Sequence, residues 1–155
     1  MGTPRRAGPP YGLPAQATTQ GGQFWTPIGG QYSTPVDSQP DFAIEHVETS
    51  LRLSPRERMG QPLLLMGAAY FFKRQFHEAA AKLLLSIQDH PGFPNSYRGL
   101  AACYAHMGRL DEARAIVARL RAITPLVMPS VLPWRNPEDR ELFLSGLRLA
   151  AGEPT

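Results

Sequence analysis

Apolar residues recur at helical spacing through most of the chain after residue 40. Between residues 76 and 89, Ala79, Leu83 and Ile87 stand four positions apart, as on the buried face of a helix. The segment from residue 110 to Pro125 has a similar stripe, made by Ala113, Ile116, Val117, Leu120 and Ile123. The segment 61–74 is apolar nearly all round, which predicts a helix covered on two sides.

Turn and cap residues divide these stripes into helices. Pro91 and Gly92 end the helix over 76–89, and Gly108 ends the next one. Asn95 or Ser96 is the predicted cap of that next helix, which extends to His106 or Met107. The pattern therefore predicts two helical hairpins, over 60–91 and 94–125.

The two hairpins repeat one another at a period of 34 residues. A shift by this period superposes residues of the same kind in the two hairpins. A large residue, a small residue and an aromatic ring come first: Leu63 on Tyr97, Gly67 on Ala101 and Tyr70 on Tyr104. An alanine and a closing proline follow, Ala79 on Ala113 and Pro91 on Pro125. This period and these residue types resemble the tetratricopeptide repeat. The resemblance implies a solenoid that binds other proteins and has no catalytic role.

Two further helices flank the hairpins. Over residues 41–55, Ala43, Val47 and Ser50 precede Pro55 at the offsets of a second repeat helix, which predicts half a repeat. At the other end, Asn136 and Pro137 followed by two acidic residues predict a helix over 137–151. We expect this helix to cap the solenoid, and Trp134 to tuck the preceding connector under it.

The predicted fold class is thus all-α, a tetratricopeptide solenoid of about two and a half repeats and a C-terminal capping helix within residues 41–155. Residues 1–40 contain 7 of the 14 glycines and 7 of the 16 prolines, with only three charged residues. Such a segment buries too little apolar surface to offset its ordering entropy. It is therefore predicted to be a disordered tail.

Charge and cysteine content narrow the function. The net charge is +3, and the four arginines between residues 109 and 121 have Asp111 and Glu112 among them, which favours a solvated helix face over a nucleic-acid surface. The longest apolar run, residues 62–72, is too short to span a membrane. One cysteine and no secretory signal indicate a cytoplasmic protein.

Catalytic and metal-binding patterns are weak. The histidines are too scattered to predict a metal site, and we expect no cofactor. Cys103 precedes His106 by one helical turn, so a nucleophile and base pair is conceivable, but a small buried helix residue is the favoured interpretation. The chain is therefore predicted not to be an enzyme.

In tetratricopeptide arrays the first helix of each repeat lines a concave groove. The resemblance places nine residues there: Leu64, Leu65, Ala68, Phe71, Phe72, Arg98, Ala102, Ala105 and His106. Arg98 alone is too little to clamp a peptide carboxylate, so the expected partner is a protein or peptide with an apolar or helical segment. In the alternative, Leu64, Leu65, Phe71 and Phe72 pack against residues 42–53 or against the tail.

The segment from Pro133 to Arg148 is similar to the tail that follows such repeats in bacterial class III adenylate/guanylate cyclases. This resemblance implies that the chain is the detached regulatory end of a bacterial nucleotide-cyclase-type signalling protein. In the alternative interpretation, the chain is classed as an adenylate/guanylate cyclase of cAMP signalling because of this resemblance, although the catalytic domain is absent. The unpaired half repeat at 41–55 also predicts self-association.

Overall fold

The structure is a computed structural model that describes residues 39–53, 60–132 and 134–153. Within these ranges it contains six α-helices and no strand. The helices are α1 (Pro40–Leu53), α2 (Gly60–Phe72), α3 (Phe76–Asp89), α4 (Pro94–His106), α5 (Leu110–Ile123) and α6 (Pro137–Ala151). The tail predicted over 1–40 lies outside the described residues except for Gln39 and Pro40, and Pro40 already belongs to α1.

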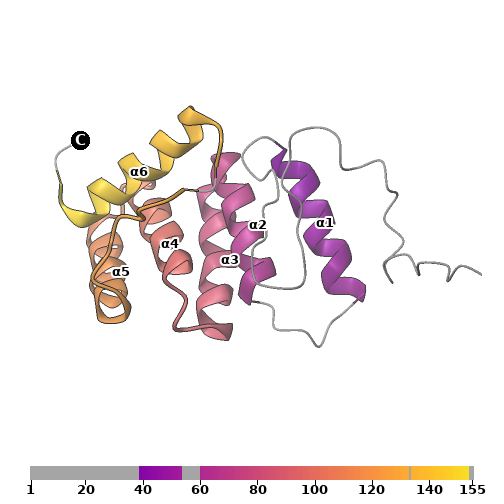
Figure 1. Cartoon of the computed structure of the whole chain (residues 1–155), viewed down its shortest axis with the longest axis horizontal. Helices are drawn as coiled ribbons and strands as arrows, with labels where there is room; N and C mark the ends of the chain where they lie inside the picture. The colour runs from indigo at the N-terminus through magenta and orange to yellow at the C-terminus, as the bar shows by residue number, and fades with distance from the viewer. Residues whose placement is uncertain (1–38, 54–59, 133, 154–155) are drawn as a thin grey trace, which may run out of the picture. The chain divides into compact units, whose positions relative to one another are not determined.

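The helices form the predicted hairpins. Helices α2 and α3 pair as one antiparallel hairpin, and α4 and α5 pair as the next (Figure 1). Helix α3 also packs along α4, so the second helix of one hairpin contacts the first helix of the following hairpin. Helix α1 packs against α2 in the same way, as expected for the second half of a preceding repeat. This arrangement is a tetratricopeptide-type solenoid.

Helix starts agree with the sequence at one end and differ at another. The Asn136 side chain accepts a hydrogen bond from the Glu138 backbone N–H at 3.0 Å, and Pro137 occupies the first turn of α6, which confirms the predicted cap. The prediction that Asn95 or Ser96 caps the first helix of the second hairpin, α4, is wrong. Helix α4 begins at Pro94 with Phe93 as its cap residue, because proline fits the first turn and Ser96 is needed inside the core.

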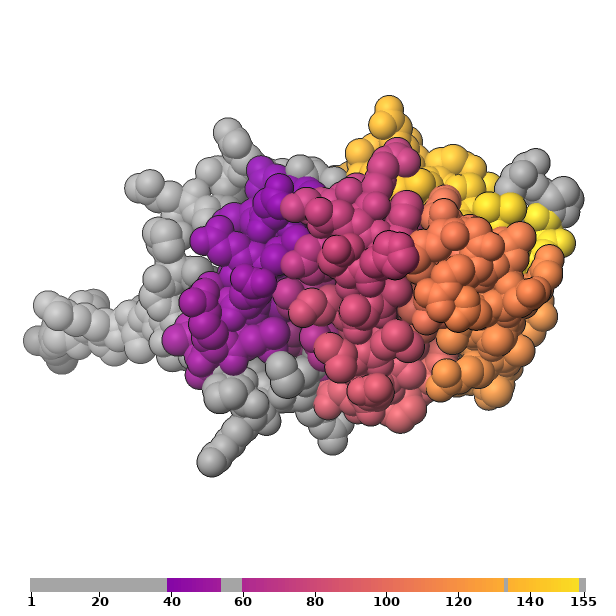
Figure 2. Space-filling view, turned by 180° about the vertical axis from the view of Figure 1, so that it is seen from behind, coloured from indigo at the N-terminus to yellow at the C-terminus, as the bar shows by residue number. Residues whose placement is uncertain are grey.

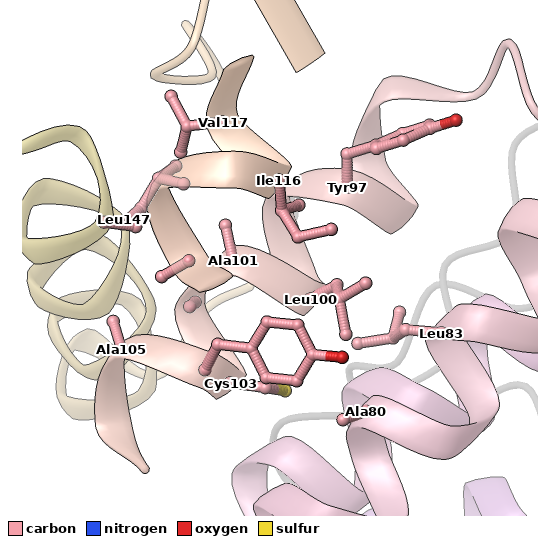
Figure 3. Close-up of a cluster of buried hydrophobic side chains, with 14 of the residues drawn as sticks. Ala80, Leu83, Tyr97, Leu100, Ala101, Cys103, Ala105, Ile116, Val117 and Leu147 are labelled. Atoms are coloured by element: carbon pink, nitrogen blue, oxygen red, sulfur yellow. The ribbon is translucent and has the colours of Figure 1, made fainter. Parts of the chain in front are cut away.

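Leu83 lies at the centre of the packing between the two hairpins. Its side chain is 1% exposed and projects from α3 toward α4, where Leu100 meets it (Figure 3). A Cβ atom added to Gly67 on α2 would lie 2.6 Å from Leu83 Cγ, and one added to Gly99 on α4 would lie 3.1 Å from Leu83 Cδ1. Both neighbouring helices therefore approach Leu83 where they carry no side chain.

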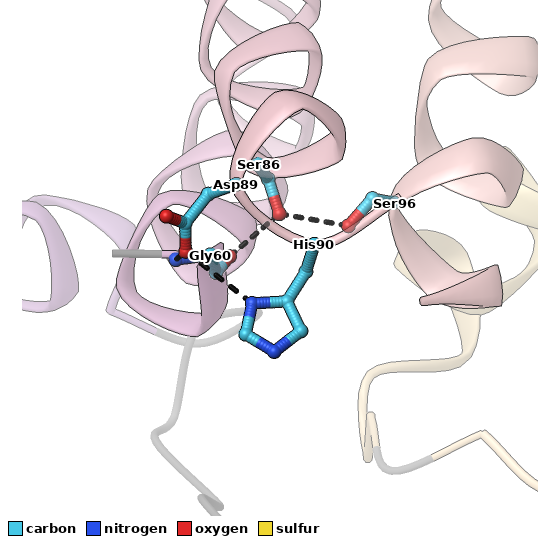
Figure 4. Close-up of polar contacts among 5 residues, drawn as sticks. All are labelled: Gly60, Ser86, Asp89, His90 and Ser96. Atoms are coloured by element: carbon cyan, nitrogen blue, oxygen red, sulfur yellow. Dashed lines mark hydrogen bonds and ion pairs between the residues drawn. The ribbon is translucent and has the colours of Figure 1, made fainter. Parts of the chain in front are cut away.

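A buried polar cluster joins the same three helices near their ends. The Ser86 hydroxyl lies 2.8 Å from the Ser96 hydroxyl and donates to the Gly60 carbonyl, and both serines are fully buried (Figure 4). The Asp89 carboxylate accepts from the Gly60 backbone N–H at 2.7 Å. This carboxylate satisfies a first-turn donor of α2 from a neighbouring helix, so α3 contributes a cap to the start of α2.

The repeat pattern changes character at α5. On α3, Ala80 and Ile87 are buried in the cluster shared with α4. The residues 34 positions later on α5 are Arg114 and Arg121, and both are exposed. The face of α5 on which a third hairpin would stack is therefore charged. Figure 2 displays α1 to α5 from behind, in chain order across the domain, with α6 (yellow) along one edge.

Both hairpins have a tight turn of the same kind. After α4, Gly108 has φ of +75°, and the Arg109 N–H bonds to the Tyr104 carbonyl at 2.9 Å. After α2, Arg74 takes the same position with φ of +59°, and the Gln75 N–H bonds to the Tyr70 carbonyl at 2.9 Å. A side chain in the left-handed region is strained, whereas glycine adopts it freely.

We therefore predict that Arg74→Gly stabilises the domain by about 1 kcal/mol, equivalent to a melting temperature about 4 °C higher. Thermal unfolding followed by circular dichroism measures the shift. The matched control is Gly108→Ala, which should destabilise by about 1 kcal/mol. Nothing lies within 4 Å of a Cβ atom at Gly108, so this control reports backbone strain alone. An unchanged or lower melting temperature for Arg74→Gly would contradict the prediction.

Candidate groove on the first helices of the repeats

The structure distributes the nine predicted groove residues over α2 and α4, which lie side by side. Four of them are buried: Phe71 at 2%, Arg98 at 9%, Ala102 at 0% and Ala105 at 5% exposure. The other five are half-buried: Leu64, Leu65, Ala68, Phe72 and His106. The part of the groove on α4 is covered by the chain's own C-terminal segment, residues 126–132 and 134–151. A partner-binding role for these residues stays a prediction.

Arg98 binds the connector between α5 and α6. Its Nε donates to the Val127 carbonyl at 2.8 Å, and one terminal nitrogen donates to the Leu126 carbonyl at 2.6 Å. The other terminal nitrogen donates to Asn95 Oδ1 at 2.8 Å. Burial lowers the pKa of the Arg98 guanidinium from its ordinary value, although arginine remains charged at any physiological pH. The guanidinium therefore holds two main-chain carbonyls against α4.

Helix α6 crosses α4 at a glycine. A Cβ atom added to Gly146 would lie 2.6 Å from His106 Nε2 and 3.1 Å from the Ala102 carbonyl oxygen. His106 Nε2 lies 2.7 Å from the Leu142 carbonyl, and it is the donor because a carbonyl oxygen only accepts. Helix α6 packs more on α4 than on α5. Of the two helices of the first hairpin, α3 contacts α4 more than α2 does. The capping helix thus lies over the groove side of the last hairpin.

Aromatic rings join α6 to α2, and α4 to α3. Phe143 meets Phe71 edge to face at 5.9 Å between ring centroids, and Trp134 lies 4.6 Å from Phe143 and 5.0 Å from Phe72. His106 stacks on Phe76 at 5.1 Å with an angle of 17° between the rings. These contacts confirm that Trp134 tucks the connector under the last helix. No local pattern indicated that Phe143 would meet α2 and that Gly146 would meet α4.

The part of the groove on α2 is more accessible. Leu65, Ala68 and Phe72 pack against the cluster that α1 contributes through Ala43, Ile44 and Val47. Leu64 packs at the edge of the larger cluster formed by α3, α4, α5 and α6. The alternative interpretation is supported for Leu65 and Phe72, which pack against the cluster that α1 and α2 share. Phe71 instead packs against Phe143 of the C-terminal segment, a neighbour that neither interpretation named. Leu64, Leu65 and Ala68 keep part of their surface in solvent.

Cys103 is fully buried in the core, and burial raises the pKa of its thiol well above the ordinary value (Figure 3). A buried thiol that stays protonated is a poor nucleophile, which agrees with the favoured interpretation of Cys103 as a small buried helix residue. Among the described residues, no group of three or more His, Cys, Asp or Glu side chains is placed to hold a metal ion. Within the same ranges, no helix has the length and apolar character needed to cross a membrane.

Successive helical hairpins in which each second helix packs against the next first helix define the class of helical-repeat solenoids. Residues 71–127, which run from the end of α2 past the end of α5, match the family model for the tetratricopeptide repeat. The fold and this match together support a tetratricopeptide repeat protein, and such repeats build surfaces for binding proteins. The segment 133–148, which is similar to the tail of bacterial cyclases, lies outside the matched residues. Its resemblance to cyclases therefore stays a prediction.

We predict that Arg98→Met destabilises the domain by about 2 kcal/mol, because a charged donor leaves two connector carbonyls. Urea unfolding measures the loss. Arg121→Met is the matched control, since Arg121 is exposed on α5, and it should change stability by less than about 0.5 kcal/mol. Equal stability of the two variants would show that the connector is not held by Arg98.

Proposed function

We propose that this protein is a binding module that holds an apolar or helical segment of another protein on the concave side of α2 and α4. The observation that carries the proposal is the surface of α2. Leu64, Leu65 and Ala68 are apolar, half-buried and adjacent in the hairpin array. Aliphatic residues that stay partly in solvent on a rigid helix offer area for docking at little ordering cost.

The charge of the groove supports an apolar ligand over an acidic one. Arg98 is the basic residue among the nine predicted groove positions, apart from His106, and its guanidinium is occupied by Asn95 and the connector carbonyls. A peptide carboxylate would have to compete with these bonds. An amphipathic helix needs no such donor, because its main-chain groups are satisfied internally.

The proposal is tested by displaying a library of helical peptides and selecting those that bind the purified chain. We expect binders whose affinity falls about tenfold or more on Leu64→Lys, equivalent to 1.4 kcal/mol. Lysine keeps an apolar stem along the surface and places its charge at the groove. Binding is measured by titration with a fluorescent label on each selected peptide.

Leu85→Lys is the matched control, because Leu85 is 45% exposed on α3 and lies outside the predicted groove. It should leave the affinities unchanged. Two results would contradict the proposal. One is a selection without binders to the folded chain. The other is a set of binders that are weakened by Leu85→Lys and not by Leu64→Lys.

The finer proposal is that this module is the regulatory end of a bacterial, cytoplasmic signalling protein related to nucleotide cyclases. It is supported by the resemblance of residues 133–148 to cyclase tails. Two residues of this segment have structural roles: Asn136 caps α6, and Gly146 allows α6 to pack closely on α4. Incubation of the purified chain with ATP or GTP and Mg²⁺ should yield no cyclic nucleotide, because the role assigned to it is regulatory. Turnover above background would overturn the binding-only proposal.

A further inference from the structure

The groove side of α4 is already filled by residues 126–151 of the same chain. Arg98 contacts the connector at Leu126 and Val127, and His106, two turns further along α4, contacts α6 at Leu142. Ala102 lies between them under Gly146. The predicted groove positions of the second repeat therefore contact an extended segment first and a helix second (Figure 1).

The groove recognises this internal segment chiefly through features that another polypeptide could supply. Arg98 and His106 both bind main-chain carbonyls, which every chain carries. The side chains that decide the fit are few: Phe143 against the Phe71 ring, and the small Gly146 at the crossing. Leu147 and Ala150 complete the buried stripe.

Release of α6 would leave the outward face of α5 polar. The positions of α5 that would meet a further hairpin carry the exposed Arg114 and Arg121. Helix α6 packs mainly on α4 and to a lesser extent on α5, so its release would uncover the groove side of α4 and a smaller part of α5. The opposite face of α6 is exposed and charged, with Glu138 and Glu141 in solvent.

We propose that α6 and its connector form an internal ligand of the groove, which a partner helix with the same stripe displaces. The partner carries an aromatic residue, a small residue three positions later, leucine one position after that, and a small residue three positions further on. This inference rests on the proposed function and specifies its ligand. Because the internal segment is tethered, its effective concentration is on the order of millimolar, so a partner binds well only when α6 is loosened.

The test uses the full-length chain and a fluorescent peptide that copies residues 134–153. Gly146→Val in the chain places a side chain against His106 and the Ala102 carbonyl, which loosens α6 and leaves every groove residue intact. We expect the peptide to bind this variant at least about tenfold more tightly than the original chain, because a larger fraction of grooves is open. Fluorescence anisotropy measures the affinities.

Two controls fix the interpretation. Glu141→Gln in the chain alters the exposed face of α6 and should leave peptide binding unchanged. A peptide that itself carries Gly146→Val should bind neither chain, since it cannot approach α4. Trp134→Ala, which removes a ring from Phe72 and Phe143, is a second loosened chain and should also bind the unmodified peptide more tightly.

The proposal is overturned if the loosened chains stay helical and unfold cooperatively yet bind the peptide no better than the original. It is equally overturned if both variants unfold, since α6 would then be an integral part of the fold. Library binders that depend on Leu64 would preserve the proposed function in either case. A failed selection would contradict the proposed function, whereas tighter peptide binding by the loosened chains would still support an internal ligand on α4.

Discussion

The close approach of helices at residues without a side chain is the constraint on which the rest of the structure depends. Leu83 on α3 fills the space left by Gly67 on α2 and Gly99 on α4, so one leucine sets the distance between the two hairpins. Gly146 does the same for α6 on α4. A larger residue at any of these three positions would force helices apart that share one continuous core.

The residues that stabilise the packing of the helices also shape the proposed binding surface. The rings of Phe71, Phe76 and His106 contact one another where the hairpins pack, and Phe71 also meets Phe143. The groove side of α4 is thus built from residues that also belong to the core. On α2, by contrast, Leu64, Leu65 and Ala68 keep surface in solvent, which is why the proposed contact with a partner begins there.

Much of the fold could be predicted from local pattern. The period of 34 residues determined the two hairpins, and the spacing before Pro55 identified α1 as a second repeat helix. Asn136 and Pro137 determined the start of α6, because cap chemistry acts within one turn. The start of α4 was misplaced, since Ser96 resembles a local cap but bonds to Ser86 in the core. That choice depends on a residue of another helix.

The sequence by itself determined the repeat, its helix order and the list of residues that could face a groove. Only the tertiary structure decided that α6 and its connector lie over α4, with Arg98 and His106 binding their carbonyls. The reason is physical: helical periodicity specifies which face of a helix is apolar, but not which other apolar face covers it. That pairing follows from shape, here from a glycine at the crossing and a set of rings around Phe143.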